Sequence, residues 1–352
     1  MPTLWIFDIE PHEQRYTSEW QTYLPKQIEG FRQANSRKRW NVQTISTIQT
    51  GGKLSQGAFL NFAETNVYKS FQVSAFAKDV ELKNVKPGDR LLFTDAWHPG
   101  VVQCRYMSDL LNLDLTIDVM WHAGSYDKHD ILSQKTKNKR WSFAFEQAIY
   151  EAADRNYFAT QYHRDLFLLG LKIGPSKKCR IVGWPMEYLP NLLKDRYKTP
   201  NKNTIIFPHR ISPEKQPDIF RNLQAVLGSH DLVLAQSKPL DKSDYHDLLG
   251  DSIASFSASH QETLGIGTYE AMLCGAIPIV PARLAYKEIY QDICYPSIWT
   301  KDRNKAMQFA PAIAAHINNM QVAYTPLQIH NMARVIGGQY FNGGKLYAQL
   351  FR

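Results

Sequence analysis

Two cations and two carboxylates in the second half of the chain have spacings that suit a diphosphate site. Arg210 and Lys215 stand five positions apart after an apolar segment, and Glu262 and Glu270 stand on either side of a turn that contains Gly265. A guanidinium, an ammonium and the free amides of a helix start are fixed donors for a negatively charged leaving group. Glu270 can reach a ribose diol from the same helix. Two solvated cations and an ordinary turn are the alternative reading.

The segments around these residues alternate between short apolar runs and helical patterns. This alternation predicts an α/β fold with parallel, doubly wound sheets, whose ligands bind beyond the carboxyl ends of the strands. Gly275 closes the helical segment after Glu270 and has the position of a C′ glycine. We interpret these runs as strands: 3–10, 41–47, 90–97, 115–124, 155–160, 179–184, 203–210, 231–236, 252–259 and 276–282.

The length of 352 residues suggests two domains. The charged segment 191–202 lacks periodicity, and we interpret it as a linker between a Rossmann-like domain over 1–190 and a second one over 203–330. The amphipathic segment 331–352 is expected to form a C-terminal helix that packs back on the first domain.

The composition favours an anionic partner. The chain has 41 basic and 33 acidic residues, a formal charge of +8, and most of the excess lies in residues 1–200. A charge that only aids solubility is the alternative. The four cysteines have no metal-ligand spacing, no D-x-D pair is present, and no apolar run is long enough to span a membrane. We expect a reduced, cytoplasmic, monomeric protein without a signal peptide, a metal or a cofactor.

The motifs R-x-x-x-x-K at 210–215 and E-x-x-G-x-x-x-x-E-A-x-x-C-G-x-x-P at 262–278 resemble those of the retaining GT-B glycosyltransferases, the large family that includes sucrose-phosphate and glycogen-type synthases. The resemblance covers most of residues 203–290 and implies the GT-B fold, two Rossmann-like domains facing a cleft. It implies that Arg210 and Lys215 neutralise the donor diphosphate, Glu270 binds the donor ribose, and Glu262 lies beside the transferred sugar. The loop residues that it assigns to donor binding are Thr263, Leu264 and Gly265.

Within this family, FPHR (207–210) and PARLAYKEIY (281–290) are most similar to the branch that mannosylates queuosine in tRNA. The opening DIEPHEQRYTSEW (8–20) resembles phage DNA-base glycosyltransferases. The family's usual glycine-rich first loop is absent. The resemblance further implies that His122, at the end of a predicted strand, faces the donor sugar across the cleft, although a histidine in such a position is often structural.

The candidate acceptor contacts lie in the first half. Side chains that follow two predicted strands are candidates, and the alternatives are a surface loop and a capped strand end. The runs SRKRW (36–40) and SQKTKNKRW (133–141) each join basic residues to a tryptophan, as expected of a surface that binds phosphates and stacks on bases. A solvated, mobile loop is the other reading of such runs. The candidates are Glu13, Arg15, Tyr16, Asp95, Trp97, His98, Lys135, Lys137, Lys139 and Arg140.

These observations together predict an enzyme, a retaining glycosyltransferase that uses a nucleotide-sugar donor, with UDP as the favoured nucleotide. The intact set of two cations and two glutamates argues against a module that only binds nucleotide sugars. The expected acceptor is a hydroxyl on a modified nucleic-acid base, foremost phage DNA of the 5-hydroxymethylcytosine type. Modified tRNA and a lipid or polysaccharide are the alternatives, and no amphipathic basic helix supports a stable membrane association.

Overall fold

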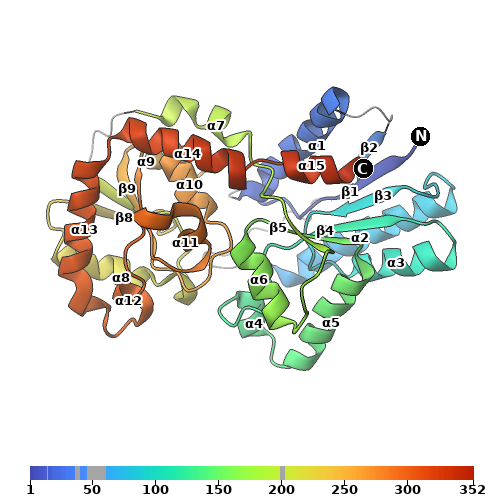
Figure 1. Cartoon of the computed structure of the whole chain (residues 1–352), viewed down its shortest axis with the longest axis horizontal. Helices are drawn as coiled ribbons and strands as arrows, with labels where there is room; N and C mark the ends of the chain where they lie inside the picture. The colour runs from blue at the N-terminus through green and yellow to red at the C-terminus, as the bar shows by residue number, and fades with distance from the viewer. Residues whose placement is uncertain (14, 36–39, 46–60, 199–202) are drawn as a thin grey trace. The chain divides into compact units, whose positions relative to one another are not determined.

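The computed structural model describes residues 1–13, 15–35, 40–45, 61–198 and 203–352. These residues form two compact units (Figure 1). Unit 1 contains Met1–Pro185 and Asn342–Arg352, and unit 2 contains Met186–Phe341.

Unit 1 is built on a parallel sheet in which the described strands follow the order β2-β1-β3-β4-β5-β6. The strands β1 and β3 are buried along their whole length, which is typical of apolar strands covered on both faces. The elements of this unit are β1 (Thr3–Phe7), α1 (Tyr16–Asn35), β2 (Asn41–Thr44), α2 (Phe62–Glu81), β3 (Arg90–Phe93), α3 (Gly100–Leu110), β4 (Thr116–Met120), α4 (Ile131–Lys135), α5 (Lys139–Ala152), β5 (Arg155–Phe158), α6 (Gln161–Gly170), β6 (Cys179–Ile181) and α15 (Gly344–Leu350).

Unit 2 contains a second parallel sheet, with its described strands in the order β10-β9-β7-β8. Its strands are β7 (Thr204–Phe207), β8 (Asp231–Leu234), β9 (Ser252–Phe256) and β10 (Ile277–Ile279). Its helices are α7 (Leu189–Leu192), η1 (Lys194–Arg196), η2 (Pro213–Lys215), α8 (Pro217–Asn222), η3 (Leu223–Ala225), α9 (Lys242–Gly250), α10 (Ile266–Leu273), α11 (Leu284–Tyr290), η4 (Gln291–Ile293), α12 (Ile298–Lys301), η5 (Ala306–Phe309), α13 (Ala310–Ala323) and α14 (Pro326–Tyr340).

Both sheets reverse their strand order once. In unit 1 the chain moves from β1 to β2 on one side and then to β3 on the other, and β7, β8 and β9 repeat this pattern in unit 2. Right-handed crossovers in opposite directions place helices on opposite faces of a sheet. The predicted doubly wound α/β class is therefore confirmed. Ligands of such sheets bind at the carboxyl edge where the order reverses, after β1 and β3 or after β7 and β9.

The segment expected to be a linker packs into unit 2 as far as the structure describes it. The chain passes from one unit to the other at Pro185–Met186, and residues 191–198 contribute to α7 and η1. The side chain of Arg196 lies 2.8 Å from Asp247, and Lys198 lies 2.6 Å from Asp251. These ion pairs hold the segment against α9 and its end, while 199–202 lie outside the described residues.

The C-terminal segment forms two helices instead of one over 331–352. Helix α14 packs against α10 in unit 2, and α15 packs against α1 in unit 1 (Figure 1). The break lies between the two helices, where Phe341 is the C-cap of α14 and Gly343 is the N-cap of α15. Arg90 and Arg155 each donate a hydrogen bond of 2.6 Å to the main-chain oxygen of Gln349 and so attach α15 to the sheet of unit 1.

The predicted helix end at Gly275 is confirmed. Gly275 has a φ of +95°, and its amide donates to the carbonyl of Met272 at 2.9 Å. The amide of Ala276 donates to the carbonyl of Ala271 at 3.0 Å. This pair of bonds is a Schellman motif, which stops α10 and directs the chain into β10.

None of the helices in the described ranges combines the length and the apolar character that crossing a bilayer requires.

Candidate donor site

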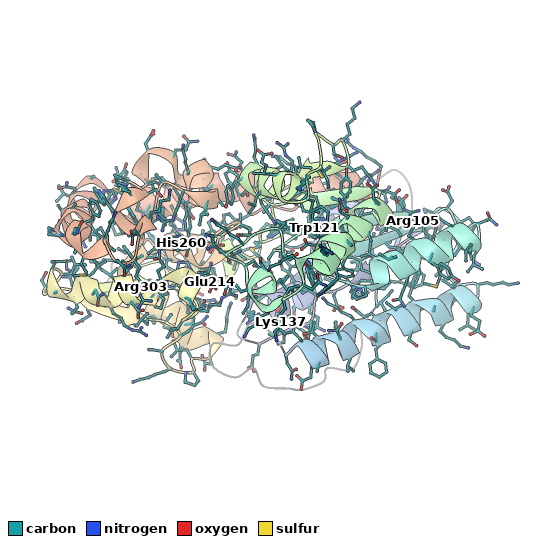
Figure 2. The ribbon with its side chains drawn as sticks, turned by 90° about the horizontal axis from the view of Figure 1, so that it is seen from below. Arg105, Trp121, Lys137, Glu214, His260 and Arg303 are labelled. Atoms are coloured by element: carbon teal, nitrogen blue, oxygen red, sulfur yellow. The ribbon has the colours of Figure 1, made fainter. Side chains whose placement is uncertain are left out.

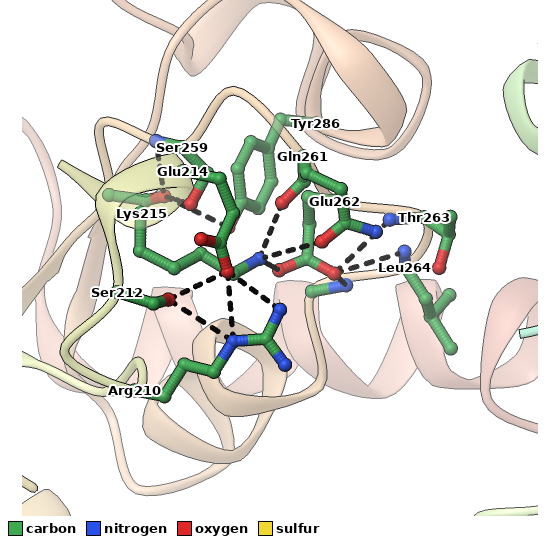
Figure 3. Close-up of polar contacts among 12 residues, drawn as sticks. Arg210, Ser212, Glu214, Lys215, Ser259, Gln261, Glu262, Thr263, Leu264 and Tyr286 are labelled. Carbon is green, nitrogen blue, oxygen red and sulfur yellow. Dashed lines mark hydrogen bonds and ion pairs between the residues drawn. The ribbon is translucent and has the colours of Figure 1, made fainter. Parts of the chain in front are cut away.

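The reversal of strand order in unit 2 brings together the motifs that the sequence singled out. Strands β7 and β9 are paired neighbours, with Ile206 opposite Ser255. The segment with Arg210 and Lys215 follows β7, and the loop with Glu262 follows β9, so both start from the same edge of the sheet. Figure 3 shows the three side chains gathered at this edge.

Lys215 is buried within this cluster, with its ammonium directed at the loop after β9. Its Nζ donates to Glu262 Oε2 at 3.1 Å and to the side-chain oxygen of Gln261 at 3.3 Å, and it also contacts the Gln261 carbonyl (Figure 3). A buried cation held at a fixed position can act on a bound anion without reorganising first.

Glu262 is ionised in this environment. Its Oε1 accepts hydrogen bonds from the amides of Gly265 (3.0 Å), Thr263 (3.2 Å) and Leu264 (3.4 Å). Burial raises the pKa of Glu262, but the charge of Lys215 and these hydrogen bonds outweigh burial and lower the pKa to about 2. The loop amides that the resemblance assigns to the donor thus bind the carboxylate of their own loop here.

Gly265 has a sharp steric reason to be glycine. It precedes α10 with a φ of +82°, and a Cβ added there would lie 2.8 Å from Cε1 of Tyr286. An L-residue would be strained by the backbone and would also collide with the aromatic ring. The turn that connects Glu262 to α10 therefore depends on this glycine.

Arg210 is held by an acidic neighbour. Its Nε and Nη2 donate to Oε1 of Glu214 at 2.9 and 2.7 Å, and Nε also donates to Oγ of Ser212 at 3.1 Å (Figure 3). Burial raises the pKa of Glu214, but the Arg210 charge outweighs burial and lowers it. The guanidinium is thereby fixed beside Lys215 on the same edge of unit 2.

Glu270 lies in α10 and faces α9 rather than the loop of Glu262. Its Oε2 accepts a hydrogen bond of 3.1 Å from the Tyr245 hydroxyl, and its Oε1 lies 3.8 Å from Nζ of Lys242. Glu270 as a whole is only 3% exposed. A ribose that binds Glu270 would therefore share its carboxylate with the Tyr245 hydroxyl.

The sequence alone did not identify the partners of this site. Glu214 stands four positions after Arg210, a spacing at which an ion pair could have been expected. Tyr245 and Tyr286 come from distant segments, and no local pattern marks them. His209 is buried with its Nε2 unpaired, and burial and the Lys215 charge lower its pKa to about 3.

His122 belongs to unit 1, where both of its ring nitrogens are engaged. Nε2 lies 2.7 Å from the Thr94 carbonyl and Nδ1 lies 2.9 Å from the Tyr16 hydroxyl. A carbonyl only accepts, so Nε2 carries the proton and Nδ1 accepts from Tyr16. Burial lowers the pKa of His122, which favours the neutral ring. Of the other candidates in this loop, Glu13 is exposed and Arg15 is half-buried.

Asp95 and Trp97 are fixed at the end of β3. Lys69 Nζ lies 2.6 Å from Oδ2 of Asp95, and the Trp97 amide donates to Oδ1 at 3.1 Å. The Trp97 indole donates to Oε1 of Glu146 at 2.9 Å. Burial raises the pKa of Glu146 to about 7, so this contact lies in a weakly solvated part of the carboxyl edge.

His98 fits the second of the two interpretations given above, a side chain that caps the end of a strand. The ring is 2% exposed, its Nε2 lies 3.1 Å from Oε1 of Gln72, and its Nδ1 accepts from the Gly100 amide at 2.9 Å. Burial lowers its pKa to about 3. The expectation of an acceptor contact is therefore corrected for this residue, because its polar atoms are used inside unit 1.

The basic run 133–141 is more ordered than the solvated loop considered from the sequence. Lys135 ends α4, and Lys139 and Arg140 begin α5. All three are exposed, and so is Lys137 between the helices, which Figure 2 labels. The ammonium of Lys139 is partly engaged, since it donates to Oγ of Ser133 at 2.9 Å.

The tryptophans of the two basic runs, Trp141 and Trp40, differ in their exposure to solvent. Trp141 is 50% exposed and lies edge-on to Trp97, with ring centroids 6.3 Å apart. Trp40 is 7% exposed and packs against Phe351, with the Arg90 guanidinium over its ring. The expectation that Trp40 offers a stacking surface is wrong, because the ring is part of the core. The preceding residues 36–39 lie outside the described ones.

Comparisons with known proteins agree on the fold. No protein-family model matches the chain. Sucrose-phosphate synthase from Thermosynechococcus elongatus is similar over 99% of both chains, with a TM-score of 0.65 and 14% identity. The pneumococcal O-GlcNAc transferase GtfA, solved with UDP and GlcNAc, is similar over 81% of this chain and 60% of its own, with a TM-score of 0.55 and 12% identity. The chain therefore has the GT-B fold.

A curated relative is similar in sequence over a shorter stretch. The tRNA-queuosine alpha-mannosyltransferase of Drosophila melanogaster is 32% identical over 123 residues, which cover 33% of this chain. The match covers 32% of that protein, about a third of its length.

Proposed function

We propose that this protein is a retaining glycosyltransferase that transfers a sugar from a nucleoside diphosphate to an acceptor hydroxyl. The observation that carries the proposal is the cluster of Arg210, Lys215 and ionised Glu262 at the carboxyl edge of the unit 2 sheet. This cluster lies at the reversal of strand order in a GT-B fold, where ligands of such sheets bind. UDP is the favoured nucleotide, in line with the UDP bound to GtfA.

The chemistry requires a stable leaving group. As the bond between the anomeric carbon and the diphosphate breaks, negative charge grows on the β-phosphate, and Arg210 and Lys215 are donors for that charge. The acceptor oxygen attacks from the face that the diphosphate leaves, which retains the configuration. Its proton passes to a departing phosphate oxygen. Glu262 stabilises the positive charge that develops on the sugar ring.

Nucleic acid is the acceptor class that we propose. Exposed cations at Lys137 and Arg140 stand beside Trp141, and this ring leads to Trp97 at the carboxyl edge of the unit 1 sheet. Cations that contact phosphates next to an exposed ring that stacks on bases are typical of single-strand binding. The name of the Drosophila relative favours a modified base in tRNA over the phage DNA expected from the sequence. The experiment therefore has to include both tRNA and hydroxymethylated DNA as acceptors.

The test begins with the donor. Thermal shift against a panel of UDP, GDP and ADP sugars identifies the nucleotide that binds. The protein is then incubated with this donor and with tRNA or hydroxymethylated DNA, and the nucleosides are analysed by mass spectrometry. A nucleoside with the mass of one added hexose or pentose supports the proposal. A donor that is consumed only in the presence of a lipid or glycan would replace the acceptor part of it.

If the basic residues at 135–140 bind nucleic acid, the affinity should depend on the salt concentration. Replacing Lys135, Lys137, Lys139 and Arg140 by serine should weaken nucleic-acid binding and flatten its dependence on salt. Each lost phosphate contact should reduce the slope of log K against log salt by about 0.7 to 0.9, because fewer counterions are released. Binding is measured for tRNA, single-stranded DNA and duplex DNA at several salt concentrations.

Nucleotide-sugar binding is the control for this variant and should not change, because the donor cluster belongs to unit 2. A wild-type protein that binds none of the three nucleic acids at low salt would contradict the nucleic-acid assignment.

We also propose that transfer needs no metal ion. Arg210 and Lys215, at the edge of the sheet after β7, supply the positive charge that a metal ion would otherwise supply to the diphosphate. Activity should survive an excess of EDTA in a steady-state assay. Activity that EDTA abolishes and Mn²⁺ restores would refute this prediction.

A further inference from the structure

Arg283 joins three parts of unit 2 through main-chain oxygens. It lies between β10 and α11, and its guanidinium donates to the carbonyls of Ala258 (2.6 Å), Ser259 (2.8 Å) and Ser297 (3.0 Å). The first two belong to the loop after β9, where no neighbouring strand supplies amide donors. An arginine offers five N–H donors in one rigid plane, so it can hold three such oxygens at once.

The residue after Lys215 binds the same loop. Gln216 has a left-handed backbone, with a φ of +56°, and its Nε2 donates to the carbonyls of Ala258 (2.5 Å) and Thr300 (2.9 Å). Nη2 of Arg283 also donates to Ala258, and its distance to the Thr300 oxygen is 3.5 Å. Both side chains therefore hold the same two carbonyls, and the Lys215 segment is fixed to the loop of Glu262 at these points.

The charge of Arg283 is held by uncharged oxygens. The contacts that the structure describes for its guanidinium are carbonyl and hydroxyl oxygens, with no carboxylate among them. Burial lowers the pKa of Arg283. A poorly solvated cation without an anionic partner is costly. The carbonyl oxygens that Arg283 holds are the partners that offset this cost.

We propose that Arg283 is a positioning residue of the donor site, which clamps the carbonyls of Ala258 and Ser259 so that Glu262 stays in register with Lys215. The inference rests on the proposed function and adds a residue that neither of the two motifs contains. Loss of the clamp would leave Glu262 and Lys215 present but misplaced. A displacement of about 1 Å at a catalytic site can reduce the rate by about 100-fold.

The test compares Arg283→Met and Arg283→Lys with the wild type in kcat, donor KM and melting temperature. The matched control is Arg303→Met, because Arg303 is an exposed arginine of the same unit (Figure 2). We expect Arg283→Met to lower kcat by about 10- to 100-fold. Arg283→Lys should remain within a few-fold of Arg283→Met, because a lysine keeps the charge but lacks the planar fork. Arg303→Met should behave as wild type.

A double-mutant cycle separates positioning from a general structural role. If Arg283 acts by aligning Lys215, Arg283→Met should reduce kcat by less than about threefold when Lys215→Ala is already present. Independent, multiplicative losses would overturn the proposal, and so would a wild-type kcat in Arg283→Lys. If Arg283→Met does not fold, Arg283→Lys takes its place in the cycle. A wild type that neither binds nor transfers a nucleotide sugar would instead defeat the proposed function.

Discussion

Replacing Lys215 by alanine should lower kcat by about two to three orders of magnitude, the loss typical when one oxyanion donor is removed. The loss corresponds to ~2.7–4 kcal/mol of transition-state stabilisation. The ammonium is buried and already held at the edge of the sheet, so it can act on the leaving diphosphate without reorganising first. Arg210→Ala should have an effect of similar size. Both are measured as steady-state kcat with the donor identified by thermal shift.

Lys305→Ala is a suitable control, because Lys305 is an exposed lysine of the same unit. It should leave kcat and the melting temperature unchanged. Near-normal turnover in both Lys215→Ala and Arg210→Ala would mean that the diphosphate does not bind at this cluster.

Replacing Glu262 and replacing Glu270 should change different kinetic parameters. Glu262→Ala is expected to lower kcat by about 100-fold with little change in donor KM, because its ionised carboxylate acts on charge that develops during bond breaking. Glu270→Ala is expected to raise donor KM by about tenfold, the scale of one lost hydrogen bond to a charged group, with a smaller change in kcat. Full kinetic curves over donor concentration measure both parameters.

Glu262→Gln is the isosteric companion, because it keeps the shape of the side chain and removes its charge. It should resemble Glu262→Ala in kcat if the charge matters. A Glu262 variant that changes only KM, together with a Glu270 variant that changes only kcat, would mean that the two roles are exchanged.

The fold class was predictable because its signal is local. Buried parallel strands are short apolar runs, and the residues at 204–207 and 252–256 are strands within the ranges expected from the sequence. The boundary between the two units was harder to predict from the sequence. The segment 191–202 is charged and aperiodic, yet its described part is held by ion pairs to residues about 50 positions away. No local pattern encodes such a partner.

The same limit applies to the sites. Arg210, Lys215 and Glu262 stood out because their spacing follows strand ends, and the structure brings them together. His98 and Trp40 were misjudged, because a polar or aromatic residue near a strand end can point into the core or toward solvent. The decisive partners of these two residues, Gln72 and Phe351, lie far from them in the sequence.

The return of α15 to unit 1 has a consequence for how the chain folds during synthesis. Arg90 and Arg155, at the start of β3 and β5, both donate to the main-chain oxygen of Gln349, and Arg90 also donates to that of Arg352. A nascent chain can complete unit 2 as soon as residues up to 341 have left the ribosome, whereas unit 1 must wait for residues 342–352. We therefore expect the half that is translated first to finish folding last.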